Sequence, residues 1–138
     1  MYFIFLGIDG VLNTTSSKSW IEKPLVKNLS FLKGSIVLTS SWKTEWDFGK
    51  PKGRMKEFNR ILWACGLSIA DKIDEGDRPM MISKYLSEHP WNGYVILDDE
   101  WWDGYEKHTH HLVQINPKEG LTFEKVLFAN SLLQKEIF

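Results

Sequence analysis

The chain has 138 residues, of which 43% are hydrophobic, and a formal net charge of −1. This length fits one compact domain, 1–138, with enough apolar material for a core and no room for a second domain. The nearly balanced charge argues against nonspecific binding of long nucleic acid. Cys65 is the single cysteine, which excludes an internal disulfide.

The N-terminal segment and the cysteine content favour a cytoplasmic protein. Residues 1–6 are apolar, but they are too few to span a membrane and lack the basic start and cleavage pattern of a signal peptide. A lone cysteine fits a reducing compartment. We therefore expect a cytoplasmic location and no membrane partner.

The first predicted elements are a buried strand and a short helix. Residues 2–8 form a near-continuous apolar run closed by Asp9 and Gly10, which is typical of a strand covered on both faces. Pro24 can open a short helix, and Gly34 is expected to end it.

A second strand and two longer helices follow. The strand is predicted over residues 36–39, where β-branched apolar residues give way to hydroxyls. Apolar residues repeat at helical spacing over residues 55–65, and Gly66 stands at the position of a C-terminal cap. A further helix is expected over about residues 80–88, with Pro79 near its start.

The C-terminal part adds two strands and a last helix. Residues 94–97 form a buried strand that ends in an acidic cluster, and residues 112–115 form a short strand. Thr122 can cap a final helix whose apolar face includes Val126 and Ile137. Strands alternate with helices throughout, which predicts an α/β fold with a doubly wound, mostly parallel, Rossmann-like sheet.

Polar residues gather where the predicted strands end. In a doubly wound sheet these carboxyl ends form the ligand site, so Asp9, Thr39 to Ser41, and the pair Asp98 and Asp99 should converge. Simpler readings stay open: Asp9 as a turn residue, the hydroxyls as helix caps, and the acidic pair as the start of a loop. Two adjacent carboxylates repel each other unless a cation or basic residue compensates, and their hard oxygens suit magnesium.

Four segments in order resemble the motifs of the haloacid dehalogenase (HAD) superfamily. Its first motif reads Asp-x-Asp-Gly, and this chain has Gly7 at the first aspartate. The closing segment, residues 113–122, is similar to that of HAD domains in bacterial and phage proteins and in Swiss army knife RNA-repair proteins. The four segments, in motif order, are residues 7–13, 37–43, 77–82 and 96–100.

The resemblance implies a HAD-like domain without a cap domain and assigns roles to single residues. Asp9 matches the aspartate that shuttles protons, and Thr39 the hydroxyl that holds a phosphoryl oxygen, with Ser40 as its helper. Arg78 would balance the phosphate charge. Lys84 is a less favoured alternative, because it lies further along the same helix and can face solvent.

Gly7 changes what this resemblance implies for activity. Glycine can neither attack phosphorus nor coordinate a metal, so Asp98 and Asp99 are left to hold a magnesium that binds weakly or only with its ligand. Losing a covalent nucleophile costs roughly 10⁴ to 10⁶ in rate. Three accounts remain: a natural protein that only binds, an engineered substitution, or a water that attacks directly.

Three functions are compatible with these residues. The first is a HAD-like pocket that binds a phosphorylated small molecule, such as a nucleotide, with little or no hydrolysis. The second is a magnesium-dependent phosphatase that acts on nucleotides or nucleic-acid ends. The third is a protein-interaction module on the same scaffold, since a fold does not fix a function.

Aromatic and histidine residues near the strand ends are further candidates. Three tryptophans can stack on a base at the mouth of the site, or simply pack: Trp20, Trp101 and Trp102. His108, His110 and His111 are expected to be surface residues. The alternative is a metal pair of His108 and His110, which would share one face of a strand.

Overall fold

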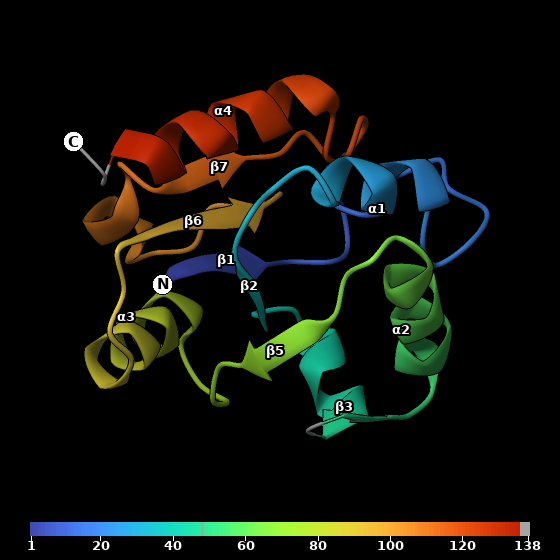
Figure 1. Ribbon diagram of the computed structural model, residues 1–138, viewed down its shortest axis with the longest axis horizontal. Helices are drawn as coiled ribbons and strands as arrows, with labels where there is room; N and C mark the ends of the chain where they lie inside the picture. Colours follow the sequence, from blue (N-terminus) through green and yellow to red (C-terminus); the bar gives the residue numbers. More distant parts are fainter. Residues whose placement is uncertain (48, 136–138) are drawn as a thin grey trace.

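The computed structural model describes residues 1–47 and 49–135, and its centre is a five-stranded sheet (Figure 1). The strand order is β5-β2-β1-β6-β7, and every neighbouring pair is parallel. This confirms the predicted α/β fold with a doubly wound sheet. The strands are β1 (Tyr2–Leu6), β2 (Ser35–Leu38), β5 (Ile69–Lys72), β6 (Gly93–Asp98) and β7 (Leu112–Gln114).

Helices cover both faces of the sheet. One face carries α1 (Lys23–Leu29), α2 (Arg54–Ala64) and α4 (Phe123–Lys135), and the other carries α3 (Arg78–Glu88) with the 3₁₀ helix η2 (Tyr105–His108) (Figure 1). A second 3₁₀ helix follows β2, and a short antiparallel hairpin follows it: η1 (Ser41–Glu45), β3 (Trp46–Asp47) and β4 (Lys50–Pro51).

The alternation of side chains along β1 builds the two cores. Ile4 and Leu6 point into the core beneath α1, α2 and α4, whereas Phe3 and Phe5 point into the core beneath α3. Both phenylalanine rings meet Tyr85 of α3 edge-on, at 5.4 and 5.8 Å between centroids. These contacts fix α3, and with it Arg78 at its first turn, against the sheet.

Both predicted helix caps near the ends of α2 and α4 are present. Gly66 follows α2 with a φ of 76°, and the Leu67 N–H donates to the Leu62 carbonyl at 2.8 Å. The Thr122 hydroxyl accepts the Lys125 N–H at 3.3 Å and starts α4. The expected contribution of Ile137 to α4 lies outside the described residues.

The structure departs from the sequence-based elements at α1 and β5, and it adds η1, the β3–β4 hairpin and η2, which were not predicted. The first helix ends at Leu29 and not at Gly34, because the Ser30 hydroxyl binds the Lys27 carbonyl at 2.5 Å and competes with helical hydrogen bonds. Strand β5 was not predicted. Its residues Ile69–Lys72 lack an apolar run because β5 lies at the edge of the sheet, where side chains stay partly exposed.

Among the described residues, no helix is both long enough and apolar enough to cross a membrane.

Candidate functional site

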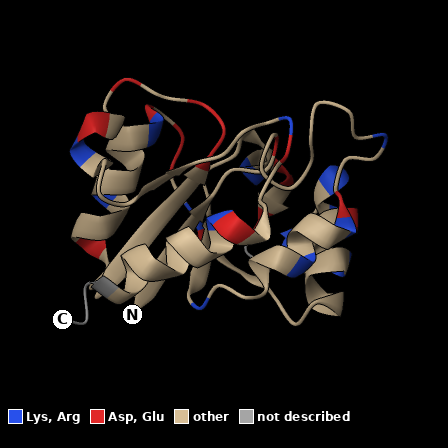
Figure 2. Ribbon diagram, turned by 90° about the horizontal axis from the view of Figure 1, so that it is seen from above, with Lys and Arg blue, Asp and Glu red and all other residues tan. Residues whose placement is uncertain are grey.

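A pocket of about 260 Å³ lies at the carboxyl ends of β1, β2 and β6. From β1 the chain runs to β2 and β5 on one side of the sheet and then returns to β6 on the other side of β1. Such a switch point opens a crevice where ligands bind. Figure 2 shows acidic residues along much of the loops opposite the N-terminus. The sequence-predicted residues that line this pocket are Gly7, Asp9, Ser40, Arg78, Asp99 and Trp102.

Asp98 lies behind this pocket and does not line it. The residue is the last of β6 and fully buried, and its Oδ2 accepts hydrogen bonds from Arg78 Nη1 at 3.0 Å and from the Tyr105 hydroxyl at 2.7 Å. Its Oδ1 accepts the Glu100 N–H at 3.1 Å. The cation that the acidic pair requires is therefore supplied by Arg78. Burial and the charge of Asp98 raise the pKa of the Tyr105 hydroxyl, which stays a donor.

Asp99 is the member of the acidic pair that reaches the pocket. Burial, followed by the charge of Asp98, raises the pKa of Asp99 to about 6. Its carboxyl group lies directly over Gly10, where any side chain would collide with it, and Gly10 also has a φ of 77°. Glycine after Asp9 is therefore required by the approach of Asp99.

Asp9 is exposed, and two neutral groups hold its carboxylate. Asn13 Nδ2 donates to Oδ1 at 3.0 Å, and Trp42 Nε1 donates to Oδ2 at 3.2 Å. Asn13 also accepts the Gly10 N–H at 2.8 Å, which closes the turn. Asp9 is thus both a turn residue and part of the pocket, and the two readings of the sequence are compatible.

The tryptophan that orients Asp9 is itself fixed by an ion pair that no sequence motif predicts. Arg54 places its guanidinium 4.1 Å from the centroid of the fully buried Trp42 ring. Glu45 accepts from Arg54 at 3.0 Å (Nε) and 2.5 Å (Nη2), and these bonds hold the pKa of Glu45 below its usual range. Glu45 and Arg54 lie nine residues apart on η1 and α2, so no local spacing signals the pair.

The two hydroxyl residues after β2 have different environments. Ser40 caps η1, since its Oγ accepts the Trp42 N–H at 3.2 Å, so the capping interpretation is confirmed for Ser40 while it also lines the pocket. Thr39 is fully buried and, against the sequence-based expectation, does not line the pocket; its Oγ1 has no hydrogen-bond partner among the described residues. A buried hydroxyl without a partner is costly, and Thr39 is the chain neighbour of Ser40, which lines the pocket.

Gly7 forms part of the pocket floor. Its N–H donates to the Leu97 carbonyl at 2.9 Å, which continues the β1–β6 pairing beyond Leu6. A Cβ built on Gly7 would lie 3.1 Å from that carbonyl and 3.8 Å from Asp98 Oδ1. A side chain at this position would therefore point toward Asp98, with only a small adjustment of the backbone.

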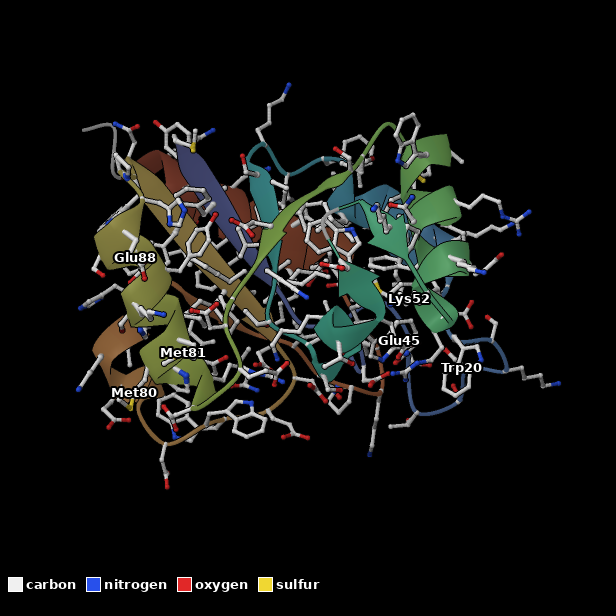
Figure 3. The ribbon with its side chains drawn as sticks, turned by 90° about the horizontal axis from the view of Figure 1, so that it is seen from below. Trp20, Glu45, Lys52, Met80, Met81 and Glu88 are labelled. Carbon is white, nitrogen blue, oxygen red and sulfur yellow. The ribbon has the colours of Figure 1, made fainter. Side chains whose placement is uncertain are left out.

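The three candidate stacking tryptophans do not share one location. Trp102 lines the pocket, and Arg78 lies 4.6 Å from its ring centroid. Trp101 is exposed and packs edge-on against Tyr105, and it does not line the pocket. Trp20 is exposed on the opposite side of the molecule from Met80 and Met81 (Figure 3) and lines a separate depression beside α1.

The histidine expectation was wrong for His108. His110 is exposed, but His108 is buried, with Nε2 3.0 Å from the Ser83 hydroxyl and Nδ1 2.8 Å from the Tyr94 hydroxyl. Burial lowers the pKa of His108, which favours a neutral ring. The residue lies in η2 and not in a strand, so the alternation that would pair it with His110 does not apply.

Lys84 does not reach the pocket of Asp9. It pairs with Asp74 and, at 3.8 Å, with Glu88. This supports Arg78 over Lys84 as the cation of the site.

The residues of the pocket do not by themselves fit a resident magnesium ion. Both oxygens of Asp98 already accept hydrogen bonds, and no group of three or more His, Cys, Asp or Glu side chains among residues 1–47 and 49–135 could hold a metal. Magnesium prefers several oxygen ligands in near-octahedral geometry. A phosphate ligand would have to contribute oxygens before the shell could be completed.

Comparison with known proteins gives one match. A family model described as "HAD domain in Swiss Army Knife RNA repair proteins" matches residues 3–126. Searches of curated proteins and of solved structures found no match to the chain.

Proposed function

The chain belongs to the family of HAD domains in Swiss Army Knife RNA repair proteins, and from this premise we propose that its pocket binds a phosphorylated small molecule, of the nucleotide class, with little or no hydrolysis. The fold is HAD-like and presents Asp9, Ser40 and Arg78 at one pocket. In this proposal Gly7 stands where members of the superfamily have the nucleophilic aspartate. The pocket then keeps its phosphate contacts and lacks the group that forms the covalent intermediate.

The observation that carries the binding proposal is the buried Thr39 hydroxyl. Leaving a buried donor unpaired costs about 1–3 kcal/mol, and an acceptor supplied by a ligand next to Ser40 would offset that cost. A phosphoryl oxygen beside Ser40 would accept from it. Arg78, stacked on Trp102, supplies the positive charge next to that position.

Charge balance limits which ligands can bind. Among the described residues that line the pocket, Asp9, Asp99 and Glu100 carry carboxyl groups, and Arg78 is the cation. A phosphate dianion needs further positive charge, which magnesium can bring when it arrives with the phosphate. We accordingly propose that magnesium binding depends on the ligand.

Thr39→Val tests this proposal because it separates stability from binding. Replacing the unpaired hydroxyl by a methyl group should stabilise the ligand-free protein by about 1 kcal/mol, since a desolvated donor is removed. The same change should weaken binding of a nucleoside monophosphate about fivefold or more. Urea unfolding and calorimetric titration, with and without magnesium, measure the two effects.

Thr15→Val is the matched control, because Thr15 is exposed and, unlike Thr39, has no chain neighbour that lines the pocket. It should leave both measurements unchanged. A Thr39 variant that is less stable and binds as well as the unmodified protein would contradict the proposal. Release of phosphate by the unmodified protein at phosphatase rates would instead support a magnesium-dependent phosphatase acting on nucleotides or nucleic-acid ends.

A further inference from the structure

A second and larger pocket, of about 560 Å³, lies between α3 and η2. Its α3 wall includes Pro79, Met80, Met81 and Ser83, and its other wall includes Gly104 and Lys107. No sequence motif pointed to this pocket, because its walls come from two segments that only the packing of η2 on α3 brings together.

The two pockets are neighbours around the start of α3. Arg78 lines the first pocket and Pro79 the second, and consecutive Cα atoms are only about 3.8 Å apart. On the other wall, Trp102 belongs to the first pocket and Gly104 to the second. The two pockets share no lining residue, and Gly104 lies close against Pro79, so a ligand with its phosphate beside Arg78 would have to pass over Trp102 to reach the larger pocket.

The α3 wall of this pocket has a part held by hydrogen bonds, at Ser83, and an apolar part, at Met80 and Met81. Ser83 is held by the buried His108, which Tyr94 fixes from the other side, at 3.0 and 2.8 Å. Met80 is 63% exposed, and it lies with Met81 at the end of α3 away from Glu88 (Figure 3). Exposed methionines offer an adaptable apolar surface for a flat ligand group.

The two lysines that line this pocket, Lys84 and Lys107, differ in how far their charges are balanced. Lys84 is paired with Asp74 and Glu88, so its charge is largely balanced. Lys107 forms no ion pair within 4.0 Å of any described carboxylate. Its neighbour Glu106 accepts the Gly104 N–H at 2.9 Å, and the pKa of Glu106 is lowered first by backbone hydrogen bonds and to a lesser degree by the charge of Lys107. Lys107 therefore brings a positive charge that a ligand can use.

We propose that the α3–η2 pocket binds the rest of the phosphorylated ligand and selects for a second phosphate group. The flat organic part would cover Met80 and Met81, and the second phosphate would pair with Lys107. This inference rests on the proposed function, because the first phosphate must lie beside Arg78. The class of ligand is a phosphomonoester that carries a further phosphate, as a monoester in a bisphosphate or as a diester in a strand.

Three probes test the selection by calorimetry at fixed salt: adenosine 5′-monophosphate, adenosine 3′,5′-bisphosphate and a 5′-phosphorylated adenosine dinucleotide. The two ligands with a second phosphate should bind more tightly than the monophosphate. Lys107→Gln should weaken the binding of these two ligands about fivefold, which is the upper range for an exposed charge pair. The affinity for the monophosphate should not change. The ligand with the larger loss identifies the source of the second phosphate.

Lys33→Gln is the control, because it makes the same charge change in the exposed segment before β2, at the opposite end of the sheet. It should alter no affinity. Equal binding of all three probes to the unmodified protein would overturn the inference and leave the phosphate pocket intact. Equal losses in the Lys107 and Lys33 variants would also overturn it. Failure of every probe and of inorganic phosphate to bind would overturn the proposed function as well.

Discussion

The two sides of the phosphate pocket hold their carboxylates in different ways. On the β1 side, Asp9 is exposed and accepts hydrogen bonds from two neutral side chains, Asn13 and Trp42. On the β6 side, Asp98 is buried and accepts from a guanidinium, a phenol and a backbone N–H. Water shares the stabilisation of the first carboxylate, whereas the second depends wholly on protein groups.

Because of this difference, the Asp9 carboxylate is available to a ligand, whereas the Asp98 carboxylate stabilises the fold. Replacing Asp9 frees Asn13, which water can reach, and leaves the Nε1–H of the buried Trp42, a neutral donor, without its acceptor. Replacing Asp98 leaves a mostly buried guanidinium and a buried phenol without their acceptor, and removing one partner of a buried ion pair is strongly destabilising. The β6 side thus fixes the shape of the pocket, whereas on the β1 side the Asp9 carboxylate is accessible to a ligand.

The largest expected effect comes from breaking the β6 side. Asp98→Ala should lower the free energy of unfolding by about 3 kcal/mol, because Arg78 and Tyr105 lose a shared acceptor. Asp9→Ala, the matched change on the β1 side, should cost about 1 kcal/mol, because a single neutral donor, Trp42 Nε1, loses its acceptor. Urea unfolding followed by circular dichroism measures both. Similar losses for the two variants would show that the two carboxylates are held alike.

The next largest effect is expected from a carboxylate at position 7, between the β1 and β6 sides of the pocket. Gly7→Asp should raise turnover of an aryl phosphate or a nucleotide, assayed with magnesium, by at least ~10²-fold, a conservative fraction of the worth of a nucleophile. The new side chain would leave the chain two residues before Asp9 and point toward Asp98 Oδ1. Phosphate release measures the gain.

Gly7→Asn is the control for this substitution. It imposes the same approach to the Leu97 carbonyl, 3.1 Å from Cβ, without adding a nucleophile. Its turnover should equal that of the unmodified protein. If the Asp and Asn variants fold and remain equally inert, Gly7 is not the missing catalytic part, and the pocket serves binding alone.

The smallest expected effect is the pH dependence set by Asp99. Its pKa is raised to about 6, so the group gains a proton as the pH falls from 7.5 to 5.5, and the pocket loses a negative charge. Sulfate stays a dianion over this range, and its affinity should rise about threefold on acidification. Asp99→Asn should remove most of this change. Calorimetry that finds the same pH slope in the variant would assign the effect to another group.

Most of the elements that build the site could be predicted from the sequence. The buried runs of β1, β2 and β6 and the periodic apolar residues of α2 and α3 depend on local patterns, and each ends in a recognisable signal. Strand β5 lacked such a pattern because an edge strand is only partly buried. The boundary of α1 depended on the side-chain hydrogen bond of Ser30, which competes with helix formation.

The residues that support the site were not predictable in the same way. Tyr105 and His108 are buried although they lie in a polar segment without periodicity, because η2 folds onto α3 and β6. Arg54 and Trp42 meet only through the packing of α2 on η1. These contacts join residues with no fixed spacing, so no motif encodes them.

The sequence by itself predicted that Asp9, Ser40 and Asp99 belong to one edge of the sheet, because the carboxyl ends of parallel strands lie together. Gly7 and Arg78 were assigned to the same site by the resemblance of their segments to HAD motifs. Only the tertiary structure decided which carboxylate of the acidic pair is buried and which lines the pocket. Asp98 continues β6 and turns into the core toward Arg78, while Asp99 turns over Gly10 into the pocket. Neighbouring side chains of an extended chain point in opposite directions, and the packing of α3 and η2 settles which of them meets the cation.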